Sequence, residues 1–218
     1  MVHSAVNPPV LVRIPPKARR VLDVGCGDGA LGRAIKARRP TEVVGITFSG
    51  EEAALARSVL DEIVRADLES ADLTHLGTFD CIVCSHVLEH LREPVRLLAS
   101  LRANLAADGI VLIAVPNALH YRQRLAFLAG RFRYTDGGIM DRTHYRFFDW
   151  NTARGLVREA GLQLVEALAD GGFPGSRFLG PACDLLDRAA VSVFPGAFGV
   201  QFVLTAKDGG RSTADQRS

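Results

Sequence analysis

One short segment, residues 21–29, constrains the fold of this chain more than any other. Val21 to Val24 read as a buried strand, and they lead into Gly25, Gly27 and Gly29, with a helix-forming stretch behind them at 30–35. Glycine lets the chain turn with positive φ and lets ligand atoms approach the bare backbone, and a helix start offers unpaired N–H groups. The segment therefore predicts a strand, loop and helix that bind a nucleotide-containing cofactor.

Two acids in this segment indicate which cofactor binds. The glycines also satisfy a loose dinucleotide pattern, Gly-x-Gly-x-x-Gly/Ala, which alone is weak evidence. Asp28 would lie inside the amide cradle and repel a diphosphate, and Asp23 favours a ligand that carries positive charge. S-adenosylmethionine has an ammonium and a sulfonium and no phosphate. The acid followed by Gly-x-Gly-x-Gly resembles the first motif of the class I S-adenosylmethionine-dependent methyltransferases.

This resemblance implies a set of cofactor-binding residues. The loop contributes Gly25, Cys26 and Gly27 beside Asp23, and the residues after the third and fourth strands add others. The family places an acid for the adenine amino group after the third strand, where this chain has Asp67 followed by Leu68. Its fourth strand ends beneath the methionine portion of the cofactor, which predicts Ser85 and His86 at the site.

The second strand departs from the family pattern. The family has an acid at its end to bind both ribose hydroxyls, and this chain has Thr47 there. A threonine hydroxyl makes a weaker, neutral hydrogen bond than a carboxylate does. Glu51 or Glu52, at the start of the next helix, are candidates to replace the missing acid.

Apolar runs alternate with helical stretches along the chain, which is typical of an α/β fold with a parallel sheet covered by helices on both faces. We expect a Rossmann-like, seven-stranded, mostly parallel sheet whose final strand is antiparallel, as the family has it. The predicted strands lie near 20–25, 42–47, 62–66, 79–85, 109–115, 162–168 and 199–206, and the predicted helices near 29–38, 50–58, 93–106 and 150–160.

The predicted domain organisation is simple. Residues 1–19 form an N-terminal extension, 20–206 a single methyltransferase domain, and 207–218 a disordered tail. Two insertions exceed what the sheet needs: 117–149, predicted to form the acceptor site, and 170–198. The second contains an apolar helix candidate from Cys183 to Phe194, which suggests a homodimer interface.

Composition excludes several classes of protein. A formal net charge of +2 gives no basic signature, so we expect no nucleic-acid partner. No apolar run approaches the ~20 residues of a membrane helix, so we expect no membrane insertion and a cytoplasmic protein. Cys81 and Cys84 form a C-x-x-C motif inside a strand, where residues three apart point to opposite faces, so we expect them to be reduced and structural.

The acceptor is predicted from the first insertion. Residues 120–150 hold all three tyrosines, the only tryptophan, four phenylalanines and six arginines. Aromatic faces with hydrogen-bonding side chains suit a sugar or a planar ring. The stretch from Asp141 to Phe148 resembles the D-x-T-H-x-R-F-F element of bacterial methyltransferases associated with cell-surface glycans, which implies O-methylation of a sugar or oligosaccharide hydroxyl.

Methyl transfer to a hydroxyl needs a base, and a neutral histidine is suited to that role. His144 is the first candidate, with Asp141 as its orienting partner or as a metal ligand. His86, His90 and Glu89 compete for the role because of their position near the cofactor. Mg²⁺ dependence occurs in some sugar methyltransferases, but no ligand spacing here establishes it.

Two other functions remain open from the sequence. The segment from His86 to His90 is similar to that of methyltransferases that act on quinones or other small metabolites. The absence of an acid at Thr47 leaves room for a cofactor-binding regulator without catalysis.

Overall fold

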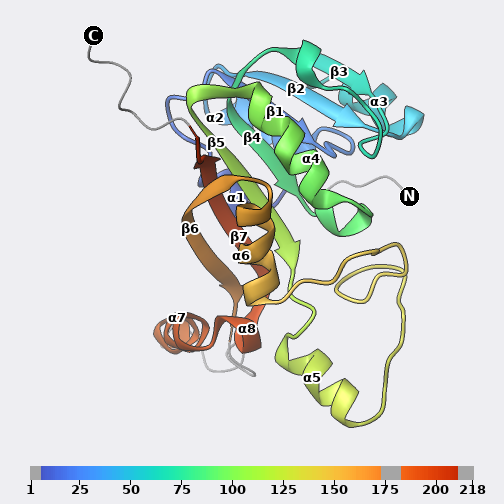
Figure 1. The fold of residues 1–218 in the computed structure, drawn as a ribbon, viewed down its shortest axis with the longest axis vertical. Helices are drawn as coiled ribbons and strands as arrows, with labels where there is room; N and C mark the ends of the chain where they lie inside the picture. Colours follow the sequence, from blue (N-terminus) through green and yellow to red (C-terminus); the bar gives the residue numbers. More distant parts are fainter. Residues whose placement is uncertain (1–5, 173–182, 211–218) are drawn as a thin grey trace.

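The computed structural model describes residues 6–172 and 183–210, and it places seven strands in one sheet with the order β3-β2-β1-β4-β5-β7-β6 (Figure 1). Strands β1 to β5 run parallel, and β7 lies antiparallel between β5 and β6. The predicted fold class is therefore confirmed. The strands are β1 (Arg20–Val24), β2 (Glu42–Thr47), β3 (Glu62–Arg65), β4 (Phe79–Ser85), β5 (Leu105–Pro116), β6 (Leu162–Gly171) and β7 (Gly199–Asp208).

Helices cover both faces because the central strands are apolar on both sides. One core contains Leu22 and Ile82 with residues of α4 (Pro94–Leu101) and α6 (Trp150–Glu159). The other contains Val21 and Val83 with residues of α1 (Pro8–Leu11), α2 (Ala30–Arg38) and α3 (Gly50–Ala56). Cys84 belongs to the first core and Cys81 to the second, and both are free thiols, as their spacing within a strand predicted.

The helix predicted over 93–106 is wrong at its C-terminal end. The α-helix stops at Leu101, one 3₁₀ turn follows at Arg102–Asn104, and β5 begins at Leu105 instead of near residue 109. The buried amide of Asn104 ends the helix, because its Nδ2 donates to the carbonyls of Leu73 and Gly77 at 3.0 and 2.8 Å. Asp108 and Gly109, which follow the predicted helix, lie in a bulge of β5 where the pairing with β4 shifts register.

Described residues near both ends of the predicted domain pack with it. Four residues of the predicted N-terminal extension are buried in the domain core: Val10, Leu11, Ile14 and Ala18. Strand β7 runs through Asp208 and pairs with β6, so the first two residues of the predicted tail are ordered. Strand β6 likewise takes the first two residues of the 170–198 insertion. Residues 173–182 and 211–218 lie outside the described residues.

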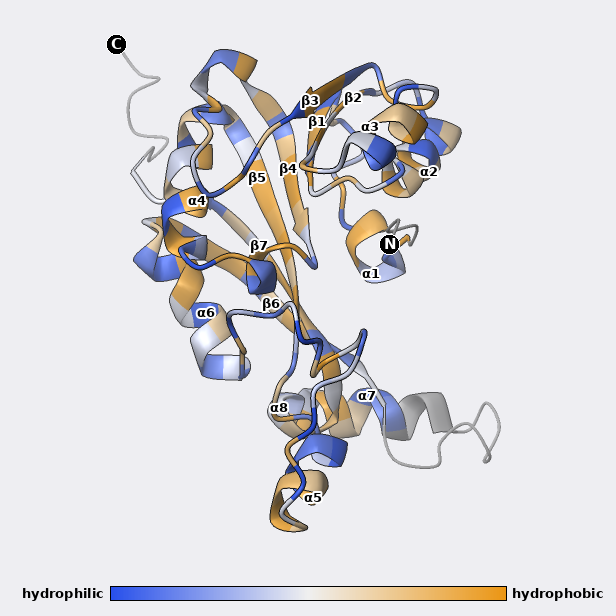
Figure 2. Ribbon diagram, turned by 90° about the vertical axis from the view of Figure 1, so that its right-hand side faces the viewer, coloured by the Kyte–Doolittle hydropathy of each residue, from blue (hydrophilic) through white to orange (hydrophobic). Residues whose placement is uncertain are grey.

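The helices of the two insertions lie at the end of the molecule away from β3 (Figure 1). The first contains α5 (Tyr121–Leu128), and the second contains α7 (Cys183–Val193), close to its predicted range, and α8 (Pro195–Phe198). Apolar and polar residues alternate along α5 in Figure 2, and α5 buries none of its residues. Within the described ranges, the helices are too short or too polar to cross a bilayer.

Candidate active site

The glycine loop between β1 and α2 has the conformation that its sequence predicted. Gly25, Gly27 and Gly29 all have positive φ (77°, 53° and 85°). A Cβ at Gly25 would lie 2.9 Å from a methyl of Val87, so only glycine fits there. The N–H groups of Gly25 and Cys26 both donate to the carbonyl of Ile46 at 2.9 Å. Because these amides already have partners, this part of the loop is not a phosphate cradle.

The loop opens into a pocket of about 770 Å³, a size typical of a site for a nucleoside-sized ligand. All nine residues predicted to bind the cofactor line it: Asp23, Gly25, Cys26, Gly27, Thr47, Asp67, Leu68, Ser85 and His86. They come from the C-terminal ends of β1, β2, β3 and β4 and the loops that follow. This is the edge of a parallel sheet at which ligands bind in open α/β folds.

Asp23 gives the pocket its most unusual group. Its side chain is 3% exposed, and Oδ2 has no hydrogen-bond partner within the described part of the chain. Burial raises the pKa of this carboxyl from 3.8 to about 7. Asp28, the other acid of the loop, accepts a hydrogen bond from the N–H of Ala30 at 3.0 Å and satisfies the start of α2. Of the two acids of this loop, Asp23 is therefore the buried one, and it is suited to a cationic ligand.

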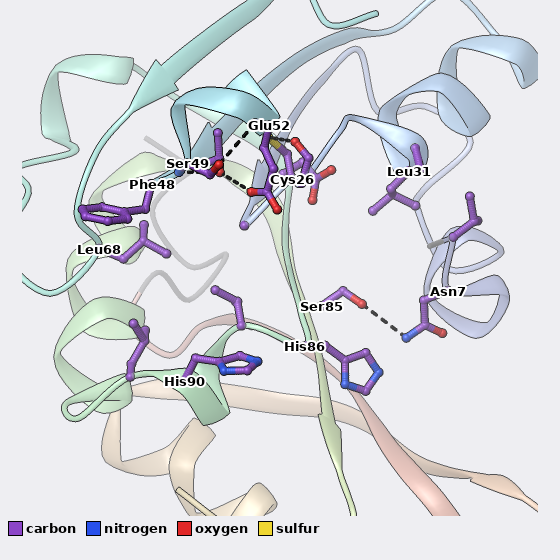
Figure 3. Close-up of a pocket in the computed structure, with 18 of the residues that line it drawn as sticks. Asn7, Cys26, Leu31, Phe48, Ser49, Glu52, Leu68, Ser85, His86 and His90 are labelled. Carbon is purple, nitrogen blue, oxygen red and sulfur yellow. Dashed lines mark hydrogen bonds between the residues drawn. The ribbon is translucent and has the colours of Figure 1, made fainter. Parts of the chain in front are cut away.

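The acid missing from the end of β2 is supplied by the next helix. Thr47 Oγ1 donates to Glu52 Oε2 at 2.7 Å, and both side chains are buried at the pocket wall (Figure 3). Ser49, the N-cap of α3, accepts from the N–H of Glu52 and so fixes the helix start. Glu51 is exposed. Of the two acids considered from the sequence, Glu52 is therefore the one placed at the pocket.

His86 lies at the end of β4 in a strained conformation. It has a φ of 54°, the only positive φ among the described residues other than glycines. Its Nδ1 lies 3.2 Å from Glu89 Oε1, and its Nε2 lies 2.9 Å from Gln201 Oε1. Burial alone would lower the pKa of His86, but the hydrogen bond and charge of Glu89 raise it above its ordinary value. The ring is thus held at the pocket floor by two partners.

The predicted contact in which the Asp141 carboxylate orients the His144 ring is not formed; the two residues are joined only by a backbone hydrogen bond, from the His144 N–H to the Asp141 carbonyl at 3.1 Å. Asp141 Oδ1 accepts from Thr143, from its N–H at 2.8 Å and its hydroxyl at 2.7 Å. His144 Nδ1 lies 3.2 Å from the carbonyl of Ile139, and burial lowers the pKa of its ring. Thr143 instead links Asp141 to His90, because the hydroxyl that donates to Asp141 also lies 3.0 Å from His90 Nδ1.

His144 stands behind His90 as seen from the pocket. His90 and Thr143 line the pocket, and the His144 ring packs edge-on against His90 with centroids 4.7 Å apart (Figure 3 shows His90). One ring nitrogen of each histidine and one carboxylate oxygen of Glu89 lie within 4.8 Å of one another. These three residues form the histidine–glutamate cluster, the group in the described ranges with the donors to hold a metal ion.

Several pocket residues were not predicted from the sequence. Asn7 reaches the site from the N-terminal segment and donates to Ser85 Oγ at 3.2 Å and to Gln201 Oε1 at 2.8 Å (Figure 3). Gln201 is a polar residue between the apolar Val200 and Phe202, which was a usable signal, whereas nothing in the sequence marked Asn7. Phe48 is 72% exposed at the rim, on the same side of the pocket as Leu68 (Figure 3).

The fold is Rossmann-like, and buried acids line a nucleoside-sized pocket at the C-terminal edge of its parallel strands. Solved structures with the fold include an S-adenosylmethionine-dependent methyltransferase from Archaeoglobus fulgidus, with a TM-score of 0.63 and 17% identity over 88% of this chain and 87% of that one. Residues 6–167 match the family model described as a methyltransferase domain. The chain belongs to this family of S-adenosylmethionine-dependent methyltransferases.

Among the curated proteins that are similar in sequence, several are O-methyltransferases. A ubiquinone biosynthesis O-methyltransferase from Xanthomonas axonopodis pv. citri is 30% identical over 72% of this chain and 68% of its own. One from Psychrobacter arcticus is 34% identical, over 45% of this chain and 41% of its own. The chain thus spans about half the length of the first relatives that it matches, 41% to 54%. Both relatives are named for ubiquinone biosynthesis, and neither name refers to a sugar.

Proposed function

We propose that this protein transfers a methyl group from S-adenosylmethionine to a hydroxyl oxygen of a small aromatic acceptor of the phenol or quinol type. The proposed cofactor rests on one observation: two buried acids, Asp23 and Glu52, lie on the wall of one pocket beside the glycine loop. The acceptor half is supported by the ubiquinone O-methyltransferases among the relatives. The glycan reading favoured by the 141–148 element becomes the second candidate.

The residues present fit this cofactor. The unpartnered Oδ2 of Asp23 suits an ammonium group, and Glu52, with Thr47 as its donor, suits the two ribose hydroxyls. Asp67, exposed at the rim, suits the adenine amino group, with Leu68 and Phe48 as apolar neighbours of the ring. The bound cofactor supplies a methyl group that is electrophilic because it is attached to a sulfonium.

The acceptor hydroxyl has to lose its proton, and histidines line that side of the pocket. Both ring nitrogens of His86 face acceptor oxygens, of Glu89 and Gln201, so neither is free to take a proton, whereas Thr143 holds only Nδ1 of His90 and leaves its Nε2 for this role. A neutral imidazole within hydrogen-bond distance of the hydroxyl can take the proton, which is typically worth about 10²–10⁴-fold in rate. A sugar hydroxyl ionises far less readily than a phenol, so a phenolic acceptor needs less help from a base to lose its proton.

The sugar candidate is kept because of the first insertion. Its aromatic and arginine side chains include Phe132, Tyr134 and Tyr145, which are 59%, 55% and 60% exposed. Arg92 lies over the Tyr145 ring at 5.3 Å. Exposed rings with cationic neighbours suit the stacking of either a sugar face or a phenol ring.

The test has a binding arm and a transfer arm. Calorimetry should show one S-adenosylhomocysteine site per chain and no measurable binding of NAD. Labelled S-adenosylmethionine is then incubated with dihydroxylated phenols, monosaccharides and oligosaccharides, and we expect label in the phenols. Label in the sugars alone would move the function to the second candidate, and NAD binding without S-adenosylhomocysteine binding would overturn both.

A further inference from the structure

The buried carboxylate of Glu89 has an oxygen that the neighbouring side chains leave without a partner. Its side chain is 1% exposed, Oε1 is paired with His86, and Oε2 has no hydrogen-bond partner in the described part of the chain. An enclosed carboxylate oxygen without a donor is costly unless something positive lies against it. His90 and His144 each bring a ring nitrogen to within 4.8 Å of this carboxylate.

Both histidines are held so that Nε2 is left with its lone pair. The Nδ1 atom of His90 lies 3.0 Å from Thr143 Oγ1 and 3.3 Å from the Thr143 carbonyl. The Thr143 hydroxyl gives its own proton to Asp141, so Nδ1 of His90 must be the donor in this contact. The Nδ1 atom of His144 faces the carbonyl of Ile139, which can only accept. Histidine ligands of metals are oriented in this way, with one nitrogen donating to an oxygen and the other binding the ion.

The backbone brings the two halves of the cluster together. The N–H groups of Tyr145 and Arg146 donate to the Glu89 carbonyl at 2.8 and 3.0 Å. The Arg146 side chain also donates from Nε to the Arg92 carbonyl at 2.9 Å. The insertion that carries His144 is therefore tied to the short turn that carries Glu89 and His90, Leu88–His90.

We propose that Glu89, His90 and His144 form a binding site for one divalent transition-metal ion, such as zinc. Two imidazoles and a carboxylate suit zinc, cobalt or manganese better than magnesium, which prefers oxygen ligands and keeps its waters. Bonds of about 2.1 Å place tetrahedral ligand atoms ~3.4 Å apart. The side chains therefore close by little more than an ångström from the 4.8 Å limit that the structure gives.

The position of the site suggests its use, and this step rests on the proposed function. Three protein ligands leave a coordination position open, and His90 with Thr143 lines the pocket, so the acceptor hydroxyl can take that position. The ion lowers the pKa of the hydroxyl, whose proton passes to solvent water. The oxygen keeps the electron pair that forms the new bond to the methyl carbon, and the pair of the broken carbon–sulfur bond stays on sulfur. When the ion is bound, His90 and His144 act as ligands, and neither acts as the base.

Metal binding is measured directly on the full chain after treatment with a chelator. We expect titration with ZnCl₂ to show one site per chain, and CoCl₂ to give the visible absorption of a low-symmetry cobalt site. MgCl₂ should bind much more weakly. His144→Ala should weaken zinc binding by about 100-fold or more, and Thr143→Val by about 10- to 100-fold, because it removes only the partner of a ligand. His75→Ala, an exposed histidine outside the cluster, is the matched control.

Two further measurements keep the outcomes separate. Glu89→Gln is made alongside, and S-adenosylhomocysteine affinity is measured for each variant to verify that the pocket is folded. Zinc binding that is absent in the wild type, or unchanged in His144→Ala, would overturn the site. Zinc binding as expected without methyl transfer to any phenol or sugar would support the site and count against the proposed function alone.

Discussion

At the scale of single residues, the site depends on carboxyl groups that are kept away from water. Asp23 is the clearest case, because burial raises its pKa to about 7 while the same group in the unfolded chain titrates near 3.8. Between these values the folded protein binds a proton that the unfolded chain does not. The free energy of unfolding therefore falls as the pH rises from about 4 to about 7, and the penalty is constant above that.

Asp23→Asn should remove this dependence. The variant should be more stable than the wild type at pH 8, by at most about 4 kcal/mol, and the difference should shrink towards pH 5. Denaturant unfolding at several pH values measures it, with Asp67→Asn, an exposed acid of the same pocket, as the control. A constant difference between the wild type and Asp23→Asn across this range would contradict a buried, titrating Asp23.

Glu52 belongs to the same scale. If it binds the ribose, Glu52→Gln should weaken S-adenosylhomocysteine binding by about tenfold, because a charge-assisted hydrogen bond is replaced by a neutral one. Glu51→Gln, the exposed neighbour, should leave the affinity unchanged. Calorimetry with a cofactor analogue that lacks the ribose hydroxyls gives a second readout, since Glu52→Gln should no longer distinguish it from S-adenosylhomocysteine. Equal affinities for Glu52→Gln and the wild type would move the ribose contact elsewhere.

The sequence predicted the pocket well where motifs are local and poorly where residues come from distant segments. Asp23 lies at the C-terminal end of β1, and the loop glycines and Asp67 lie just beyond the ends of β1 and β3, so their place at one edge of the sheet could be inferred. Asn7 and Gln201 reach the same pocket from near the two ends of the chain. The sequence also could not predict the direction of side chains. It placed Asp141 and His144 close together, but it did not show that the Asp141 carboxylate pairs with Thr143.

At the scale of elements, side-chain caps set the ends of the helices, and the hydrophobic periodicity of the sequence does not reveal these caps. The helix expected to continue to residue 106 stops at Leu101 because Asn104 is held by carbonyls from another segment. By contrast, α6 begins within one residue of its predicted range. Its start is fixed by a capping box in which Asp149 accepts from the N–H of Thr152, and Thr152 bonds back to the Asp149 N–H.

This cap gives a prediction for α6. Asp149→Ala should lower the free energy of unfolding by about 0.5–2 kcal/mol, because N–H groups at the helix start lose their acceptor. Asp149→Asn should cost less, since asparagine is also a good N-cap residue. Chemical denaturation of the two variants beside the wild type measures the difference. Equal losses for alanine and asparagine would show that the charge of Asp149, and not its cap, stabilises the helix.

At the scale of the whole molecule, the N-terminal segment, residues 6–19, packs into the core of the domain. Ile14 is 3% exposed in the core formed by α1 and α2, whereas Val12, two residues earlier, is 62% exposed. The sequence could not show this, because four prolines interrupt the segment and hide any periodicity. Its packing beneath the sheet depends on contacts with residues far along the chain.

Substitutions in this segment test its role. Ile14→Ala should destabilise the protein by about 2–5 kcal/mol, because it leaves a cavity in the core. For a domain of this size, each kcal/mol lowers the melting temperature by about 2–4 °C. Val12→Ala should change it little. Thermal unfolding of both variants is the measurement, and equal melting temperatures would mean that the segment is not part of the cooperative fold.

The antiparallel strand β7 has a consequence for how the protein is made. It lies inside the sheet, between β5 and β6, although it is the last strand in the chain. Asn117, at the end of β5, donates to the carbonyls of Gly196 and Gly199, and Gln201 holds the ring of His86. A ribosome-bound chain can thus assemble the five parallel strands early, but it cannot complete this pocket until residue 201 has left the exit tunnel. The pocket is therefore completed only when β7 enters the gap between β5 and β6.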